Sequence, residues 1–370
     1  MNHLDTLLVH PPSVTGEPTG STSTPLYQTA TFDVRRGGYD YSRSGNPTRD
    51  VLEAQLARLD GGCRALAYGS GIAAIAAVLR LVGRGREVLV GSDLYGGTLR
   101  LLASLETELD LEVRLVDTSR IDAVRAALSS RTALVLLETP SNPMLRISDI
   151  PALADLAHAH GALLAVDNSV MTPLLQRPLG LGADIAVQSA TKFLGGHGDL
   201  TAGVVVVRDP ELGERLASRH NAEGIALAPM ESWLLLRGLE TLAVRLERQI
   251  ESTAYIASFL RGHPEIQRVH AAPAPGAGVL SFETGDLGLS RRLVDLTSLF
   301  SAAVSFGAVG SSISLPCEMS HASVPMHWRS TQDLPTDLVR LAVGIEAPED
   351  LVADLDNSLR RAATPWEVSA

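Results

Sequence analysis

The sequence predicts an α/β protein with a large domain built on a mostly parallel sheet and a smaller α+β domain towards the C-terminus. From Cys63 to about Val207, short apolar segments alternate with segments of helical periodicity. This alternation is typical of parallel strands covered by helices on both faces. The length of 370 residues exceeds the size at which one hydrophobic core usually keeps growing. A long amphipathic segment, Pro229 to about Leu260, joins the two predicted domains, with a kink expected at Gly238.

Local signals place the individual elements. Apolar segments predict strands at Arg64–Tyr68, Glu87–Val90, Glu112–Val116, Ala133–Glu138, Ala162–Asp167, Asp184–Gln188 and Gly203–Val207, then at Val279–Phe282 and Leu338–Val343. Helical periodicity and capping residues predict helices at Arg49–Leu59, Asp149–His160, Ser290–Leu296 and Pro348–Arg361.

The first part of the chain differs from the rest. Residues 1 to about 39 are rich in Pro, Thr, Ser and Gly and lack helical periodicity, which indicates an arm or extended loop. The segment Gly45–Thr48 then predicts a turn into the first helix. We therefore divide the chain into an arm (1–45), a large domain (46–237) and a small C-terminal domain (238–370).

Composition and charge exclude several classes of protein. Apolar residues make up 45% and charged residues 20%, as in ordinary globular proteins, and no apolar run reaches the length of a membrane span. The net charge of −11, with scattered basic residues, argues against a nucleic-acid surface. The N-terminus shows no signal peptide, and the two cysteines, Cys63 and Cys317, form no CxxC pattern. We expect a cytoplasmic protein without disulfides or a zinc-finger site.

Lys192 is the strongest candidate for a catalytic residue. It lies in VQSATKFLGGHGDL (187–200), where an apolar strand precedes it and Ser189 and Thr191 flank it. The glycines that follow allow the backbone to approach a ligand closely. Such a lysine is suited to form an imine with an aldehyde cofactor that carries a phosphate. The alternative is an ordinary surface charge.

Other predicted strand ends also carry polar or aromatic residues, on the side where ligands bind in parallel sheets. Asp167 ends the apolar run ALLAVDN. A carboxylate there either caps a turn or keeps the pyridine nitrogen of a cofactor protonated. Tyr95 in DLYGGT follows another strand, and it is either a turn residue or an aromatic face stacked on a flat ring.

The segment Gly69–Ile72 opens a helix directly after a strand, which is typical of an anion site. It also fits the GxGxxA pattern of dinucleotide-binding folds, with Asp93 near the expected acidic position, so a Rossmann dehydrogenase is an open alternative. No GxxxxGK[ST] occurs, which excludes a P-loop. His158 and His160 lie two apart on a helix and make a poor metal pair, so no metal is expected. Two further histidines in loops near the expected site either touch the ligand or are structural: His197 and His321.

Taken together, the motifs extend over nearly the whole chain. In order they are PLYQTATF (25–32), YSRSGNPTR (41–49), YGSGIAAI (68–75), DLYGGTLR (93–100), ETPSNP (138–143), VDNS (166–169), SATKFLGGHGD (189–199), MSHASVP (319–325) and VRLAVGIE (339–346). In these motifs the chain resembles the Cys/Met-metabolism family of PLP-dependent enzymes, which includes cystathionine γ-synthase, cystathionine γ-lyase, cystathionine β-lyase and methionine γ-lyase. The resemblance implies the aspartate aminotransferase-like fold (fold type I), with pyridoxal 5'-phosphate (PLP) as cofactor, and it decides against the dinucleotide alternative.

The resemblance implies a role for each residue of the cofactor site. Lys192 would carry PLP as an imine and move protons between substrate carbons, Asp167 would pair with the pyridinium, and Tyr95 would stack on the ring. The phosphate would be bound by Gly71, Ile72, Ser189 and Thr191. Tyr41 and Arg43 would reach the phosphate of a neighbouring subunit. The arm would therefore contact that subunit, and the family assembles as a homotetramer built from two dimers.

The resemblance also implies a substrate site for a small amino acid. Arg340 would bind the substrate α-carboxylate as a bidentate clamp, helped by Asn142 and by the backbone or hydroxyl of Ser311. Asp40 and Arg100 match acidic and basic residues of members that handle cystathionine. They favour a dicarboxylic or thioether amino acid as the substrate.

Two segments depart from the family pattern. In SFGAVGSSISLP (305–316), Gly310 and Ser312 replace the usual Glu and Leu. This replacement removes a charge and opens space near the distal end of the substrate. The segment QRVHAAPAPGAGVLSFE (267–283) is shorter than the proline-rich loop of the family.

From the resemblance we expect a PLP-dependent carbon–sulfur lyase of transsulfuration that cleaves cystathionine or a related sulfur amino acid, with γ-cleavage favoured over β-cleavage. The alternative within the family is cystathionine γ-synthase, which replaces the γ-substituent of an O-acylated homoserine. The alternative of another class is a non-catalytic PLP-binding protein. Retention of Lys192, Asp167 and Arg340 argues against that last reading.

Overall fold

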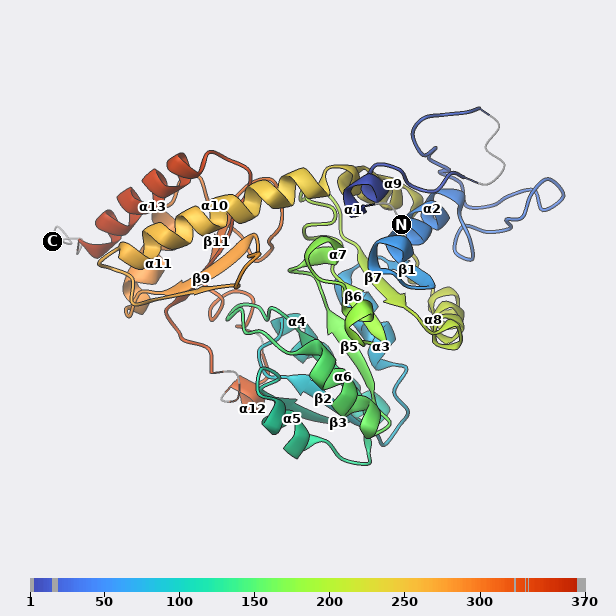
Figure 1. The fold of residues 1–370 in the computed structure, drawn as a ribbon, viewed down its shortest axis with the longest axis horizontal. Helices are drawn as coiled ribbons and strands as arrows, with labels where there is room; N and C mark the ends of the chain where they lie inside the picture. The colour runs from blue at the N-terminus through green and yellow to red at the C-terminus, as the bar shows by residue number, and fades with distance from the viewer. Residues whose placement is uncertain (1–2, 15–18, 323, 330, 332, 365–370) are drawn as a thin grey trace.

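A computed structural model of the protein describes residues 3–14, 19–322, 324–329, 331 and 333–364. Ser323 of the MSHASVP motif, parts of the predicted arm and the end of the predicted small domain lie outside the described residues. Two sheets, each with its own helices, dominate the described chain (Figure 1).

The larger sheet is mostly parallel, with the strand order β1-β7-β6-β5-β4-β2-β3 (Figure 1). Within the described residues its strands are β1 (Arg64–Tyr68), β2 (Glu87–Gly91), β3 (Glu112–Val116), β4 (Thr132–Glu138), β5 (Leu163–Asp167), β6 (Ile185–Gln188) and β7 (Gly203–Val207). β7 is antiparallel to both of its neighbours, and the remaining pairs are parallel. The predicted fold class and the predicted strands of this sheet are confirmed, with strand ends that agree to within one residue.

Helices cover both faces of the larger sheet. They are α2 (Pro47–Asp60), α3 (Gly71–Leu79), α4 (Gly96–Leu109), α5 (Ile121–Ala127), α6 (Ile150–Ala159), α7 (Thr172–Leu175), α8 (Pro210–Glu223) and α9 (Pro229–Glu240), with a 3-10 turn η1 (Pro178–Leu181). One hydrophobic core lies between the sheet and α3, α4 and α8, and the other face packs against α2, α5, α6 and α9. No helix of the described ranges is long and apolar enough to cross a membrane.

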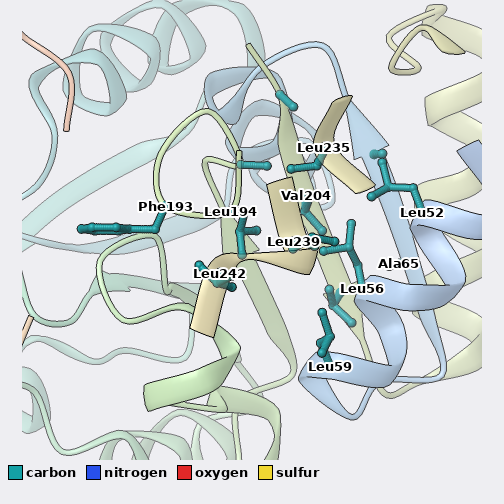
Figure 2. Packing of buried hydrophobic residues seen from close by; sticks show 14 of the residues in the cluster. Leu52, Leu56, Leu59, Ala65, Phe193, Leu194, Val204, Leu235, Leu239 and Leu242 are labelled. Atoms are coloured by element: carbon teal, nitrogen blue, oxygen red, sulfur yellow. The ribbon is translucent and has the colours of Figure 1, made fainter. Parts of the chain in front are cut away.

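The helix α2 shows how local sequence and burial act together. Asn46 caps its first turn by accepting a hydrogen bond from the Thr48 N–H (3.0 Å), and Gly61 ends it in the left-handed conformation at φ 74°. Leu52 and Leu56 point from α2 into the core against β7 and α9 (Figure 2). Full burial of a leucine side chain stabilises a fold by about 1.5–3 kcal/mol, so this face anchors the helix to the sheet.

The smaller sheet has the order β10-β11-β12-β9-β8 and is mostly antiparallel. Its strands in the described chain are β8 (Arg268–Ala271), β9 (Val279–Glu283), β10 (Ser301–Ala302), β11 (Ser312–Ser314) and β12 (Leu338–Ala342). Its helices are α10 (Leu242–Gly262), α11 (Leu287–Leu296) and α13 (Pro348–Ala363), and a short α12 (Met326–Arg329) lies near the larger sheet (Figure 1). The predicted α+β character of this region is confirmed.

The long amphipathic segment differs from its prediction in one detail. It forms two helices that meet at Thr241, and Gly238 lies buried within α9 as an ordinary helical residue. A Cβ at Gly238 would lie 2.5 Å from the Gly195 carbonyl oxygen, so the glycine permits close packing against the turn after Lys192. The expected kink at Gly238 is therefore wrong, because the sequence cannot distinguish a packing glycine from a bend.

The helix α10 links the two cores. Its first residues, including Leu242 and Leu246, pack in the core of the larger sheet, whereas Ile256 and Leu260 pack against the smaller sheet. α10 therefore runs from one sheet to the other (Figure 1). The predicted domain boundary between residues 237 and 238 stays a prediction, since one helix serves both cores.

The expectation of a helix-free N-terminal segment is wrong at α1 (Leu4–Leu8). Leu8 is buried, and the Gln55 side chain of α2 donates to the Leu7 carbonyl oxygen. This short helix depends on tertiary contacts, which its sequence does not reveal. Residues 19–46, which precede α2, form loops that project beyond the larger sheet (Figure 1).

Candidate active site

A cavity of about 200 Å³ lies at the carboxyl ends of the parallel strands of the larger sheet. Asp167 ends β5, and Lys192 follows β6. Of the residues expected to bind cofactor or substrate, the cavity is lined by Gly71, Ile72, Tyr95, Asn142, Asp167, Ser189, Thr191 and Lys192. The topology therefore brings together residues that lie up to 121 positions apart in the sequence.

One end of the cavity has the character of an anion site. The Ser70 side chain caps α3 by accepting a hydrogen bond from the Ala73 N–H (3.2 Å). The first N–H groups of a helix have no intrahelical acceptor, so those of Gly71 and Ile72 are suited to a phosphate. A Cβ at Gly71 would lie 2.8 Å from the Ser189 hydroxyl oxygen, so only glycine leaves this cradle open.

Asp167 provides a half-buried carboxylate in the wall of the same cavity. Its Oδ1 atom accepts hydrogen bonds from the Ser169 N–H (2.9 Å) and hydroxyl (2.6 Å). Among the described residues, no hydrogen bond reaches Oδ2. Burial raises the pKa of Asp167, while the bonds from Ser169 and the Lys192 cation oppose that rise. A cationic ring nitrogen at Oδ2 would complete this site.

Lys192 lies between groups that make its amine reactive. Its Nζ atom donates a hydrogen bond to the Ser305 hydroxyl (2.8 Å) and lies 4.8 Å from the centre of the Phe306 ring. The pKa of Lys192 is lowered to about 8, chiefly by burial and then by the Arg340 cation, against the opposing effect of two carboxylates. At pH 7 roughly a tenth of the amine is therefore neutral and nucleophilic, a far larger fraction than for a lysine of ordinary pKa.

Tyr95 lies at the start of α4 and lines the cavity. Its backbone N–H donates to the Glu138 carboxylate (3.2 Å), and its ring lies over Gly97, where an added Cβ would approach the ring to 2.3 Å. The glycine is therefore required for this ring position. The ring is 37% exposed and offers a face to a planar ligand.

Arg340 lies behind the cavity wall in β12. One guanidinium nitrogen donates to the Asn142 side-chain oxygen (3.2 Å), and another donates to the carbonyl oxygens of Val304 and Ser305, each at 3.1 Å. Its Nε atom is buried without a hydrogen-bond partner among the described residues. Burial lowers the pKa of Arg340 to about 10, so the group remains a cation at neutral pH. Nε and Asn142 together offer donors suited to a carboxylate.

Ser311 lies apart from the Lys192 cavity. It lines an adjoining cavity of about 910 Å³ together with Gly310 and Ser312. Its hydroxyl donates to the Glu346 carboxylate (2.9 Å), and its N–H donates to the other Glu346 oxygen (2.7 Å). The Gly344 N–H in turn donates to the Ser311 hydroxyl (2.8 Å). The expected role of Ser311 in substrate binding stays a prediction.

Four further predicted site residues do not line this cavity: Tyr41 and Arg43, expected to act between subunits, and Asp40 and Arg100, expected to contact substrate. Arg43 donates to the carbonyl (2.6 Å) and side-chain (2.9 Å) oxygens of Asn221, and its guanidinium lies 5.6 Å from the centre of the exposed Tyr41 ring. Asp40 lines a separate cavity of about 530 Å³ beside α2 and α8. Arg100 is exposed on α4. The roles of these four residues stay predictions.

The histidines have separate partners. His158 pairs with Asp184 (3.0 Å), and His160 contacts the Leu156 carbonyl oxygen (2.9 Å). His197 contacts the Gly195 carbonyl oxygen (2.8 Å). The described part of the chain contains no group of three residues suited to hold a metal ion.

Sequence reasoning missed the polar residues that support the cavity. Glu138 and Ser169 line it, and Ser305 is hydrogen-bonded to Lys192. Glu138 ends β4 directly opposite Asp167 of β5, so two carboxylates are adjacent. Burial raises the pKa of Glu138 well above its ordinary value, and the neighbouring Asp167 and Asp93 carboxylates raise it further. Glu138 lies in the ETPSNP motif and Ser169 in the VDNS motif, so these motifs could have indicated both residues.

Asp93, the acidic residue of the dinucleotide alternative, has another task. It accepts hydrogen bonds from the Ser141 hydroxyl and the Met144 N–H (3.3 Å) and thereby ties two strand-end loops together. The residues of the cavity instead fit PLP. They supply hydroxyls and helix N–H groups for a phosphate, an unpartnered carboxylate oxygen for a pyridinium, an aromatic face for the ring and a reactive amine for the aldehyde.

Comparison with known proteins agrees with this fit. The family described as Cys/Met metabolism PLP-dependent enzyme matches residues 5–360. The chloroplastic cystathionine beta-lyase of Arabidopsis thaliana is 48% identical over 92% of this chain and 77% of the relative. A cystathionine gamma-lyase of Bacillus subtilis is 41% identical over 96% of this chain and 98% of the relative. The crystal structure of a cystathionine gamma synthase from Xanthomonas oryzae pv. oryzae superposes with a TM-score of 0.93, at 35% identity, over 98% of this chain and 99% of that chain.

Proposed function

Because the chain belongs to the Cys/Met metabolism family of PLP-dependent enzymes, we propose that it is a carbon–sulfur lyase that cleaves cystathionine or a closely related thioether amino acid. The observation that supports this most directly is the single cavity that joins Lys192 and Asp167 to Asn142, the partner of Arg340. That set serves a cofactor and an amino-acid carboxylate at once.

The cofactor end of the cavity has a residue for each part of PLP. The first turn of α3 and the hydroxyls of Ser189 and Thr191 would bind the phosphate, Tyr95 would cover the ring, and Asp167 would accept a hydrogen bond from the ring N–H. When bound, PLP supplies an electron sink for an amino acid attached through its amine. The carboxylate of Asp167 would keep the ring nitrogen protonated, which would strengthen that sink.

The substrate end orients the amino acid and moves its proton. Arg340 and Asn142 bind the α-carboxylate, which turns the Cα–H bond towards Lys192. The neutral Lys192 amine would then be placed to accept the Cα proton. The ring of Phe306, which packs against both Lys192 and Arg340, excludes water from this end of the cavity.

The bond that breaks defines two branches of the reaction. Breaking the Cβ–S bond of cystathionine, with addition of one water in total, gives homocysteine, pyruvate and ammonia. Breaking the Cγ–S bond gives cysteine, 2-oxobutyrate and ammonia. Relatives named for each cleavage occur at 40–48% identity, so the order of γ over β stays a prediction.

A product assay tests the proposal. Purified, PLP-loaded protein is incubated with cystathionine, and the keto acid and the thiol are identified by mass spectrometry. Pyruvate with homocysteine establishes β-cleavage, and 2-oxobutyrate with cysteine establishes γ-cleavage. If neither pair forms but an O-acylhomoserine and cysteine yield cystathionine, the protein is a γ-replacement enzyme and the lyase proposal is wrong. PLP binding without turnover of any of these compounds identifies a non-catalytic PLP-binding protein.

We further propose a cytoplasmic homotetramer in which Tyr41 and Arg43 complete the phosphate site of a neighbouring subunit. The exposed position of both side chains supports this, and the two free cysteines suit a reducing compartment. Mixing an Arg43→Ala chain with a Lys192→Ala chain tests the arrangement, because each mixed dimer regains one intact site. We expect the mixture to regain activity. If the mixture stays inactive, Arg43 does not contribute to the site of a neighbouring subunit.

A further inference from the structure

Three consecutive residues at the start of α4 are each held by a different part of the molecule. The Asp93 carboxylate accepts hydrogen bonds from the 141–144 loop, and the Tyr95 N–H donates to Glu138 of β4. The carbonyl oxygen of Leu94, between them, lies 3.1 Å from Nε2 of His321. Asp93 and Tyr95 are thus tied within the larger sheet, whereas Leu94 is tied to the segment between β11 and β12.

The hydrogen bonds of His321 determine its tautomer. A carbonyl oxygen only accepts hydrogen bonds, so Nε2 carries the proton and donates to Leu94. Nδ1 is then an acceptor for the Ser320 hydroxyl, which lies 2.9 Å away. The ring is buried, and burial lowers the pKa of His321 to about 4, an effect that the Arg340 and Arg100 cations reinforce. The imidazole is therefore neutral and oriented from both sides.

The backbone around His321 packs directly against the start of α4. A Cβ added at Gly96 would lie 2.4 Å from the Ser320 carbonyl oxygen and 3.3 Å from the His321 Cα. This contact leaves no room for a side chain between the segment and the Tyr95 loop. The same segment continues into β12, which carries Arg340, so it links the ring-stacking tyrosine to the arginine on the substrate side.

We infer that His321 is a positioning residue, which through the Leu94 carbonyl holds Tyr95 in register with Arg340. The inference rests on the proposed function for the roles of Tyr95 and Arg340. Without the His321 hydrogen bond, residues 93–95 keep their hydrogen bonds to the larger sheet, but only packing contacts are described between them and the segment before β12. The Tyr95 side chain then varies in position relative to Arg340. A PLP ring stacked on Tyr95 would lose its fixed orientation.

A pair of variants tests this inference. His321→Leu fills similar space without a donor, and His321→Gln restores a donor amide near the position of Nε2. In apo-protein, the leucine variant should show faster amide hydrogen exchange at Leu94, Tyr95 and Gly96, with unchanged exchange in β5. After PLP is bound, its visible circular dichroism should weaken, and kcat should fall about five- to tenfold with a smaller change in KM. The glutamine variant should recover most of each property.

Several results would overturn the inference. Normal exchange at 94–96 and unchanged visible circular dichroism in His321→Leu would show that the contact does not position Tyr95. Equal impairment of the leucine and glutamine variants would point to a packing role instead. If His321→Leu does not fold, Ser320→Ala removes the orienting bond and carries the same readouts. Hydrogen exchange and circular dichroism need no substrate, so they remain decisive even if cystathionine proves not to be cleaved.

Discussion

The cofactor side and the substrate side of the cavity are built differently. On the cofactor side, Asp167 ends β5, and Ser189 and Lys192 both follow β6, so two neighbouring parallel strands of one sheet place all three residues. On the proposed substrate side, Arg340 belongs to the smaller sheet, and Ser311, which lines the adjoining cavity, lies in a loop before β11. These side chains already share hydrogen bonds with Asn142 and Glu346. A site built from strand ends is readable from local motifs, whereas a site built between two sheets depends on how they pack.

The largest expected loss of activity comes from a substitution on the cofactor side of the cavity. Lys192→Ala removes the only amine that lines the described cavity, so keto-acid formation should fall by at least about a thousandfold. Borohydride should no longer attach PLP covalently to the protein. Thr191→Ser is a matched control that retains the neighbouring hydroxyl. Activity above a tenth of the parent rate in Lys192→Ala would contradict the assigned role.

On the substrate side, Arg340→Lys is the informative change. Lysine retains the charge but loses the planar donor set, and hydrogen bonds to charged groups contribute about 1.5–3 kcal/mol, so KM should rise by about ten- to a hundredfold. Steady-state kinetics would measure this, and the visible spectrum of bound PLP should not change. A fall in kcat at constant KM would show that Arg340 acts in the chemical step rather than in substrate binding.

The pH dependence of PLP uptake connects the two sides. Since the pKa of Lys192 is lowered from the ordinary 10.5 to about 8, the neutral amine predominates above about pH 8. The rate at which apo-protein takes up PLP covalently should therefore rise with pH and level off above that value. Arg340→Met removes a cation that lowers this pKa, so its uptake profile should move to higher pH. An identical profile in both proteins would show that the two sides are electrostatically independent.

The smallest expected effect concerns Ser311. Its hydroxyl donates to Glu346 and accepts from the Gly344 N–H, and both bonds are lost in Ser311→Ala, so this change should lower the free energy of unfolding by about 1–2 kcal/mol. KM should change little if the hydroxyl has only this structural task. Thermal unfolding and steady-state kinetics distinguish the outcomes. A large rise in KM with unchanged stability would instead support the expected role in carboxylate binding.

Local sequence predicted most of the large domain because its signals are local. A strand such as Gly203–Val207 is recognisable from consecutive valines, and Gly45–Thr48 predicted a turn into the first helix. That helix begins two residues before its predicted start, at Pro47, with Asn46 as its cap. The candidate residues Lys192 and Asp167 follow such strands, so their position at one sheet edge could be predicted. The same reasoning missed α1, because that helix depends on contacts with Gln55 far along the chain.

The sequence by itself determined the fold class, the strand-end residues of the cofactor site and the family, since these depend on periodicity and on ordered motifs. Only the tertiary structure decided that Glu138 lies beside Asp167, that Ser305 receives the Lys192 amine, and that Gly238 serves close packing. These depend on strand order and on the approach of segments far apart in the chain. No local sequence pattern specifies the strand order or the approach of distant segments, because the packing of the whole core sets both.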